Sequence, residues 1–184
     1  MKGIDVSENN STVDWQAVKD AGIEFAMVRS SYGLHSVDSK FVENVNGAHA
    51  VGLKVGAWHY SYALSVDDAI QEAANCRETI ANSGLALELP VFYDMEDADG
   101  YKKERGMPTN ITEMCKAFLD NVGLNCGVYA SDSWLNGTIN WQSLGCPVWN
   151  AQWGNNDDIR GFMWQYTDSL NIGGSIFDGD IFYG

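Results

Sequence analysis

The stretch Pro90-Val-Phe-Tyr-Asp-Met-Glu-Asp97 is an apolar run that ends in carboxylates two residues apart. Because successive strand residues face opposite sides, a strand here would point Asp94 and Glu96 the same way, roughly 6–7 Å apart. Like charges at that distance push the two pKa values apart, which leaves one protonated acid beside one carboxylate. Cleavage of a glycosidic bond needs that pair, an acid for the leaving oxygen and a carboxylate for the charge on the sugar. Two exposed acids at a strand end are the alternative interpretation.

Strand-like and helix-like segments alternate on both sides of this stretch. The expected strands are Gly3–Val6, Glu24–Arg29, Leu53–His59, Pro90–Asp94, Cys126–Ala130, Val148–Trp153, Phe162–Tyr166 and Ile176–Asp178. Helices are expected from Asp14 to Gly22, from Asp38 to Gly52, from Ser65 to Gly84 with a Ser65 cap, and from Asn110 to Val122 with an Asn110–Glu113 capping box. The alternation predicts a largely parallel sheet with consecutive strands side by side.

About eight strands are enough to close an irregular α/β barrel similar to the TIM barrel. Short strands without long helices follow Ala130, so the C-terminal third of this barrel should be poor in helices. A chain of 184 residues can build one well-buried core. We therefore expect residues 1–184 to form a single domain.

The composition excludes some classes of protein. The formal net charge of −14 argues against binding to nucleic acid, which depends on Lys and Arg contacts to phosphate, and it suits a neutral or positive polymer. No run approaches 18 uncharged apolar residues, so no membrane span is expected. Met1–Val6 leads directly into a strand without the apolar core of a signal peptide. We expect synthesis in the cytoplasm and any export by another route.

The cysteines and histidines point to no metal site or disulfide. Cys76, Cys115, Cys126 and Cys146 are widely spaced without a C-x-x-C pair, and we expect them to be free and buried. The three histidines form no H-E-x-x-H motif. We expect a monomer without metal or cofactor.

Polar and aromatic residues collect where the predicted strands end, which is where barrel enzymes carry their chemistry. They are Asp5, Arg29, Trp58, Tyr60, Tyr62, Asp94, Glu96, Tyr129, Gln152, Trp153 and Asp178. Seven Trp and eight Tyr exceed the usual need of a core this size, and such rings can stack on the apolar face of a sugar. Since aromatic residues also favour strands and cores, half or more should serve packing.

The order of several motifs resembles glycoside hydrolase family 25, the muramidase lysozymes of phage endolysins and bacterial autolysins. The motifs are Gly3-Ile-Asp-Val-Ser7 with Asp14-Trp15, Gly56-Ala-Trp-His-Tyr-Ser-Tyr62, Phe92-Tyr-Asp-Met-Glu96, Gly127-Val-Tyr-Ala-Ser131, Val148-Trp-Asn-Ala-Gln-Trp153, Trp164-Gln-Tyr166 and Phe177-Asp-Gly-Asp-Ile-Phe-Tyr183. The resemblance implies an irregular α/β barrel that hydrolyses the β-1,4 bond between N-acetylmuramic acid and N-acetylglucosamine in bacterial peptidoglycan.

The resemblance also implies residue roles. Glu96 would be the general acid, and Asp94 its partner, which stabilises charge or orients the acetamido group of the substrate. Asp5 and Asp178 would complete an acidic ring. The family usually shows Val-Asp-Leu-Asn where this chain has Phe177-Asp-Gly-Asp180, which favours Asp178 over Asp180 as the fourth acid. The aromatic residues at the strand ends, with Gln152 and Arg29, would bind substrate.

The stereochemical outcome stays open at this point. Carboxyl groups about 5–5.5 Å apart would indicate a nucleophilic carboxylate, and about 6.5–9.5 Å an inverting pair. The resemblance favours a third route, retention through attack by the acetamido oxygen of the substrate.

Two other functions remain alternatives. A chitinase or glucosaminidase could use a similar barrel. Chitinases of this kind carry the longer acidic run D-x-x-D-x-D-x-E, and the residues Val91, Phe92 and Tyr93 before Asp94 disfavour that assignment. A carbohydrate-binding module would explain the aromatic residues but has no need of four converging acids.

Overall fold

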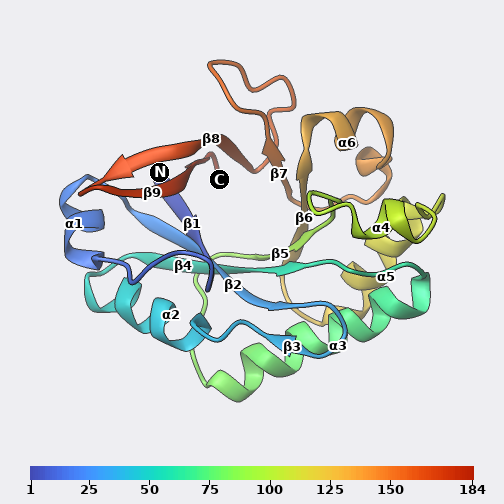
Figure 1. The fold of residues 1–184 in the computed structure, drawn as a ribbon, viewed down its shortest axis with the longest axis horizontal. Coiled ribbons are helices and arrows are strands. Elements are labelled where there is room, and N and C mark those ends of the chain that lie inside the picture. The colour runs from blue at the N-terminus through green and yellow to red at the C-terminus, as the bar shows by residue number, and fades with distance from the viewer.

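The computed structural model describes residues 1–184 and contains one nine-stranded sheet whose ends meet (Figure 1). The strand order is β1-β9-β8-β7-β6-β5-β4-β2-β3, and a further pairing of β1 with β2 closes a barrel that leaves only β3 outside. The strands are β1 (Lys2–Val6), β2 (Phe25–Tyr32), β3 (Ser36–Val37), β4 (Lys54–Tyr60), β5 (Val91–Asp94), β6 (Cys126–Ser131), β7 (Val148–Ala151), β8 (Met163–Ile172) and β9 (Ser175–Phe182). The predicted α/β barrel of about eight strands is confirmed.

Neighbouring barrel strands run parallel from β1 through β2, β4, β5, β6 and β7 to β8. Strand β9 is the exception, because it pairs antiparallel with both β8 and β1. A tight turn at Gly173 and Gly174, with φ of 61° and 91°, joins β8 to β9. Two consecutive residues with positive φ suit a two-residue hairpin, which needs no crossover helix. This hairpin is one reason why the C-terminal third is poor in helices.

The expected strands Phe162–Tyr166 and Ile176–Asp178 are shorter than β8 and β9, and the hairpin between them was not predicted.

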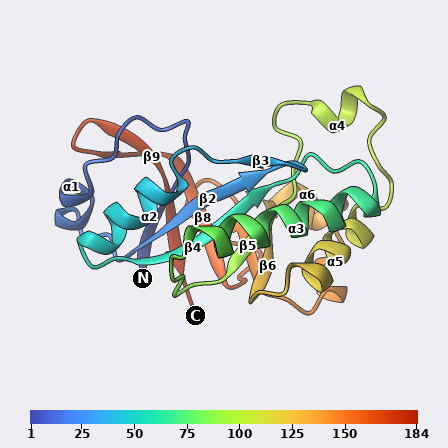
Figure 2. The ribbon, with the colours of Figure 1, turned by 90° about the horizontal axis from the view of Figure 1, so that it is seen from below.

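The helices are α1 (Trp15–Asp20), α2 (Phe41–Ala50), α3 (Val66–Ser83), α4 (Tyr101–Glu104), α5 (Ile111–Val122) and α6 (Asp132–Gly137), followed by the 3₁₀ turn η1 (Trp141–Ser143). Neither α4 nor α6 was predicted from the sequence. Helices α2, α3 and α5 lie along one side of the barrel, and only the short α1 lies near the β8–β9 hairpin, beside its tip (Figures 1 and 2). None of the helices combines the length and apolarity that a membrane crossing requires.

The sequence predicted how two helices, α3 and α5, are capped, and the structure confirms one of the two predictions. The Ser65 hydroxyl accepts a hydrogen bond of 3.1 Å from the Asp68 N–H, and Gly84 ends α3 with a φ of 66°, as predicted. The predicted capping box at Asn110 is wrong, since the Asn110 side chain makes no capping hydrogen bond to α5. The helix still forms over the predicted residues because one face of it is apolar and buried.

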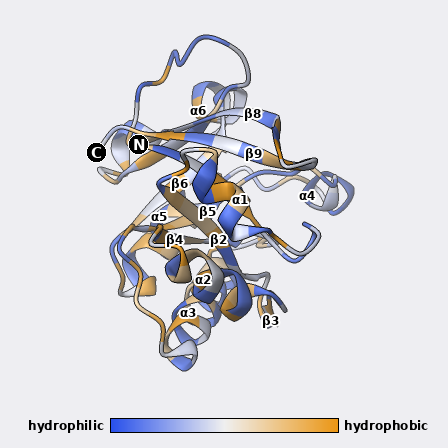
Figure 3. Cartoon of the chain, turned by 90° about the vertical axis from the view of Figure 1, so that its left-hand side faces the viewer, coloured by the Kyte–Doolittle hydropathy of each residue, from blue (hydrophilic) through white to orange (hydrophobic).

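Two apolar regions flank the barrel wall. The larger core lies between the strands and the helices, and β2 contributes to both regions because residues 25–31 are all buried. Burial on both faces is expected of parallel strands covered by helices. Figure 3 shows hydrophobic residues along central strands such as β4 and mainly hydrophilic residues around α4 at the edge.

The second region fills the inside of the barrel at the end where the parallel strands begin. It consists of Phe25, Met27, Leu89, Phe92, Trp149 and Met163. Glycines make room for these side chains: a Cβ on Gly3 would lie 2.2 Å from the Phe25 ring. Because Phe92 and Asp94 share one face of β5, the apolar filling stops one step before the first acid. Only the opposite end of the barrel can therefore hold a polar pocket.

Candidate active site

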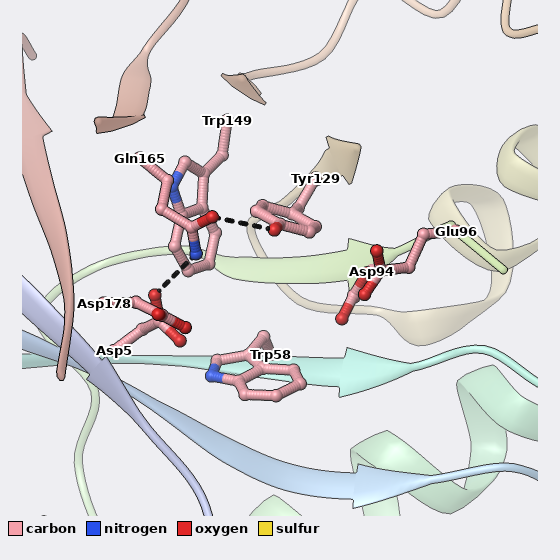
Figure 4. Close-up of a pocket in the computed structure, with 8 residues that line it drawn as sticks. All are labelled: Asp5, Trp58, Asp94, Glu96, Tyr129, Trp149, Gln165 and Asp178. Atoms are coloured by element: carbon pink, nitrogen blue, oxygen red, sulfur yellow. Dashed lines mark hydrogen bonds between the residues drawn. The ribbon is translucent and has the colours of Figure 1, made fainter. Parts of the chain in front are cut away.

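A pocket lies inside the barrel, beyond this apolar filling and towards the carboxyl ends of the parallel strands (Figure 4). Its lining comes from seven different strands or strand ends: Asp5, Trp58, Asp94, Glu96, Tyr129, Trp149, Gln165 and Asp178. Asp5 and Asp178 lie on one side, Asp94 and Glu96 on the other, and the Trp58 ring lies between the two groups in the view of Figure 4. All four acids predicted from the sequence thus reach one pocket.

Asp5 and Asp178 are neighbours because β1 and β9 pair in a register that sets these two residues opposite each other. The Gln165 side chain on β8 connects this acid pair to the aromatic wall. Its amide nitrogen donates to Asp5 Oδ2 at 2.8 Å, and its oxygen accepts from the Tyr129 hydroxyl at 3.1 Å. The indole nitrogen of Trp153 donates to the same oxygen at 3.0 Å. Gln165 therefore fixes three side chains around the pocket.

Asp94 and Glu96 reach the pocket by a route that differs in part from the prediction. Strand β5 ends at Asp94, so Glu96 lies beyond the strand. One further backbone hydrogen bond, from the Met95 N–H to the Tyr129 carbonyl at 3.0 Å, keeps the chain beside β6. Met95 is fully buried in the outer core, and Asp94 and Glu96 on either side of it face the pocket. The alternation continues past the end of the strand.

Burial governs the electrostatics of the pocket. It is the largest cause that raises the pKa of Asp5, and the neighbouring Asp180 and Asp178 charges add to it. Burial, followed by the Glu96 charge, raises the pKa of Asp94, which is only 4% exposed. The pKa of Glu96 is raised in the same way by burial, against an opposing effect of Lys102. Burial and Asp168 raise the pKa of Asp178 to about 6. Burial is thus the common cause that raises the pKa of all four acids in the pocket.

The two candidates for the fourth acid occupy different positions. Asp178 is half-buried and lines the pocket, whereas Asp180 is fully buried and does not. Asp180 accepts a hydrogen bond of 3.0 Å from the indole nitrogen of Trp149, and its other oxygen has no partner. Burial raises its pKa well above the ordinary value, and its hydrogen bond from Trp149 makes it part of the support behind the pocket wall.

Among the predicted substrate-binding residues, Trp58 and Tyr129 line the pocket and Arg29 does not. The Arg29 guanidinium is buried and donates to Asp38 at 2.8 Å and to Glu8 at 3.0 Å. It also lies 5.5 Å from the centre of the Trp58 ring. Its hydrogen bonds and its place beside Trp58 make it a support for that ring.

The other predicted binding residues lie around the pocket. The half-buried Tyr60 ring packs edge-on against Tyr62 at 5.0 Å, and Tyr62 lines a separate neighbouring hollow with Tyr32, Tyr101 and Asp99 among others. Gln152 is engaged with Asp158, to which its side chain donates at 2.6 Å. Trp153 is 60% exposed. None of these four side chains lines the central pocket.

This arrangement of acids and aromatic rings agrees with the comparison with known proteins. The profile of the glycosyl hydrolases family 25 matches residues 4–175. The chain belongs to this family. The family 25 chain is 32% identical to the autolytic lysozyme of Clostridium acetobutylicum over 177 residues, which is 95% of the chain and 52% of that protein. The N,O-diacetylmuramidase of Arthroderma benhamiae is 26% identical over 202 residues, covering 100% of the chain and 83% of that protein.

The fold of this chain is also similar to that of a solved structure. The CTP1L endolysin superimposes with a TM-score of 0.84 at 26% identity, covering 99% of the chain and 66% of the endolysin. The family 25 chain thus spans about half the length of the autolytic lysozyme and two thirds of the endolysin.

Two pocket residues of the family 25 chain, Trp149 and Gln165, were not singled out as site residues from the sequence. Both belong to motifs that carried the resemblance, and their position could have been inferred from alternation. Trp149 lies on β7 and Gln165 on β8, each pointing to the inside of the barrel. Met163 faces the inside of the barrel, so alternation places Gln165, two residues later, on the same inner face. A polar side chain at an inner position was the sequence signal that could have identified Gln165 as a site residue.

The cysteines are free, as predicted: Cys76 and Cys115 are buried, and Cys126 and Cys146 are half-buried. No group of three or more His, Cys, Asp or Glu side chains has an arrangement that could hold a metal ion.

Proposed function

We propose that this chain is a muramidase that hydrolyses the β-1,4 bond between N-acetylmuramic acid and N-acetylglucosamine in bacterial peptidoglycan. The observation that carries the proposal is the pocket in which Asp94 and Glu96 lie opposite Asp5 and Asp178 between aromatic rings. Relatives named as a lysozyme and a muramidase support it. In this proposal residues 1–184 act as one catalytic domain, as a monomer, on the cell wall.

Glu96 is the proposed general acid. It is half-buried and lines the pocket, so its carboxyl group is within reach of a bound glycan. Burial raises its pKa, which keeps a proton on the side chain at the pH where most carboxyl groups have lost theirs. In the reaction this proton passes to the glycosidic oxygen as the bond from that oxygen to the sugar carbon breaks.

Asp94 is the proposed partner that orients the substrate. It is more deeply buried than Glu96, and its Oδ1 has no hydrogen-bond partner in the protein. An acetamido N–H would provide that partner. The acetamido carbonyl oxygen would then bond to the anomeric carbon as the leaving oxygen departs, and water would later open this ring with retention of configuration. Proton NMR of the first-formed anomer tests this route, because an inverted product excludes it.

The remaining predicted residues have supporting roles in the proposal. Asp5 and Asp178 complete the acidic ring on the other side of the pocket. Trp58 and Tyr129 stack on the sugar at the point of cleavage. Tyr60, Tyr62, Gln152 and Trp153 contact more distant parts of the glycan, and Arg29 holds Trp58 in place.

The test is mass spectrometry of purified peptidoglycan digested by the wild type and by Glu96→Gln. Loss of a general acid costs about 10²–10⁴ in rate. The wild type should release fragments with reducing-end muramic acid, and Glu96→Gln should release at least about a hundredfold less per unit time. Glu104→Gln is the matched control, because Glu104 is exposed on α4 and outside the pocket.

Three outcomes would contradict the proposal. Activity above about a tenth of wild type in Glu96→Gln would remove Glu96 from the acid role, since the expected loss is larger. Reducing-end glucosamine would mean a glucosaminidase. Binding of peptidoglycan without cleavage by the wild type would mean a binding module.

A further inference from the structure

Lys102 is a buried lysine directly behind the proposed acid pair, and the proposed mechanism does not use it. Its residue is only 1% exposed although α4, which carries it, lies at the edge of the fold. The ammonium nitrogen donates to the Glu96 backbone carbonyl at 2.8 Å and to the Ser61 backbone carbonyl. These carbonyls lie just beyond the ends of β5 and β4. Lys102 therefore joins the two segments where the chain leaves the barrel beside the pocket.

The loop before α4 is organised to direct Lys102 inward. The carboxylate of Asp97 accepts hydrogen bonds from the backbone N–H of Lys102 at 2.6 Å and of Lys103 at 3.0 Å. Asp99 accepts from the Tyr101 N–H at 3.1 Å. These bonds satisfy backbone donors of a helix too short to be stable alone. The neighbouring Lys103 is exposed, so only one of the two lysines is buried.

Burying an ammonium group is costly unless its surroundings compensate it. No carboxylate lies within 4.0 Å of the Lys102 nitrogen to form an ion pair, and its direct partners are the two carbonyls. The groups that surround it from the neighbouring elements are Glu72 on α3, Asp94 on β5, Asp97 and Asp99 in the loop, Cys115 on α5, and the Tyr60 ring on β4, whose centre lies 5.8 Å from the nitrogen. Lys102 is thus a buried ammonium group among carboxylates: burial lowers its pKa, and the neighbouring carboxylate charges oppose that fall.

The Lys102 charge acts on both members of the acid pair. Burial raises the pKa of Asp94 and of Glu96, and Lys102 opposes the rise in each case. Arg29 also opposes the rise for Asp94, while Asp99, Asp178 and Asp97 add to the rise for Glu96. Without Lys102, ionisation of either carboxyl group would require a higher pH.

We infer that Lys102 is a positioning residue: its ammonium group fixes the backbone at Glu96, and its charge sets the pH range in which the Asp94–Glu96 pair is active. The inference rests on the proposed function, because it assigns Lys102 a role in that same site.

The test is the pH dependence of kcat/KM for release of reducing ends from peptidoglycan by the wild type, Lys102→Met and Lys103→Met. Methionine keeps the unbranched apolar stem of the side chain and removes the ammonium group with its charge. Lys102 opposes the rise in the pKa of both carboxyl groups, so both limbs of the Lys102→Met profile should move up, by about one pH unit, the lower end of the effect of a nearby opposite charge. Lys103→Met removes an exposed charge from the same helix and should leave both limbs in place.

A purely structural role for Lys102 predicts another result. Lys102→Met would then lose thermal stability, or lose activity equally at all pH values, with both limbs unmoved, and the inference would be overturned. If Lys102→Met does not fold, Lys102→Gln replaces it in the test, because glutamine is neutral but can still donate to a carbonyl. Its pH profile should show the same upward shift of both limbs. A wild type inactive at every pH would overturn the proposed function and this inference together, whereas an active wild type with an unmoved variant overturns the inference alone.

Discussion

Replacing Glu72 by glutamine should make the stability of this protein less dependent on pH. Glu72 lies on α3, and its side chain is fully buried behind the strand ends. One carboxylate oxygen accepts from the Tyr62 N–H at 2.7 Å, and the other accepts from the Tyr93 hydroxyl at 2.6 Å. Glutamine has the same shape, and its amide oxygen can still accept from the Tyr62 N–H. It carries no charge at any pH.

The size of the effect follows from the pKa of Glu72. Burial raises it from 4.5 to about 7, although the hydrogen bonds to the carboxylate lower it. Because the folded protein then holds the proton more tightly than the unfolded chain, the contribution to stability is complete below pH 4.5 and is lost as the pH rises through 7. At about 1.36 kcal/mol per pKa unit, the rise corresponds to about 3 kcal/mol of unfolding free energy.

Urea unfolding followed by tryptophan fluorescence measures this effect between pH 4.5 and pH 7, the window set by the two pKa values. The free energy of unfolding of Glu72→Gln minus that of the wild type should increase by about 3 kcal/mol across the window. A difference that stays constant to within about 1 kcal/mol would refute the reasoning, because one pKa unit already corresponds to more than that.

Glu88→Gln is a control of opposite sign. Burial alone would raise the pKa of Glu88, but hydrogen bonds from the Val55 N–H and from His49 outweigh it and lower that pKa. A lowered folded pKa gives stability that is present above the unfolded value and is lost as the pH falls. The stability of Glu88→Gln relative to the wild type should therefore decrease as the pH rises.

Two further substitutions test the packing and the charge of the barrel interior. Gly127→Ala should lower the free energy of unfolding by about 1–3 kcal/mol, because its Cβ would lie 2.3 Å from the Pro147 carbonyl oxygen, whereas Gly137→Ala, with open space around its Cβ, should not. Equal melting temperatures for the two variants would contradict this. Asp180→Asn should keep its hydrogen bond from Trp149 and its activity, and should raise the melting temperature near neutral pH more than at acid pH, because burial raises the pKa of Asp180. A variant that melts lower than the wild type at neutral pH would contradict this prediction.

The sequence predicted the parallel part of the barrel well because the local signals there are strong. The predicted strand Pro90–Asp94 corresponds to β5, and Ser65 and Gly84 begin and end α3 as expected. Caps and buried strands depend on residues close together in the chain. The β8–β9 hairpin was missed, since its strands are partly exposed and their alternation is weak after Tyr166. The turn at Gly173 and Gly174 was the signal that could have revealed it.

The sequence by itself determined which side chains are the candidates for the chemistry. An acid pair at the end of an apolar strand, and acids and aromatic rings at the ends of other strands, were visible because strand geometry imposes alternation over a few residues. Only the tertiary structure decided how these ends meet. The antiparallel β9 brings Asp178 opposite Asp5, a contact between residues far apart in the chain that no local pattern encodes. Burial also comes from the fold alone, and burial is the main cause that raises the pKa values of the acids in the pocket.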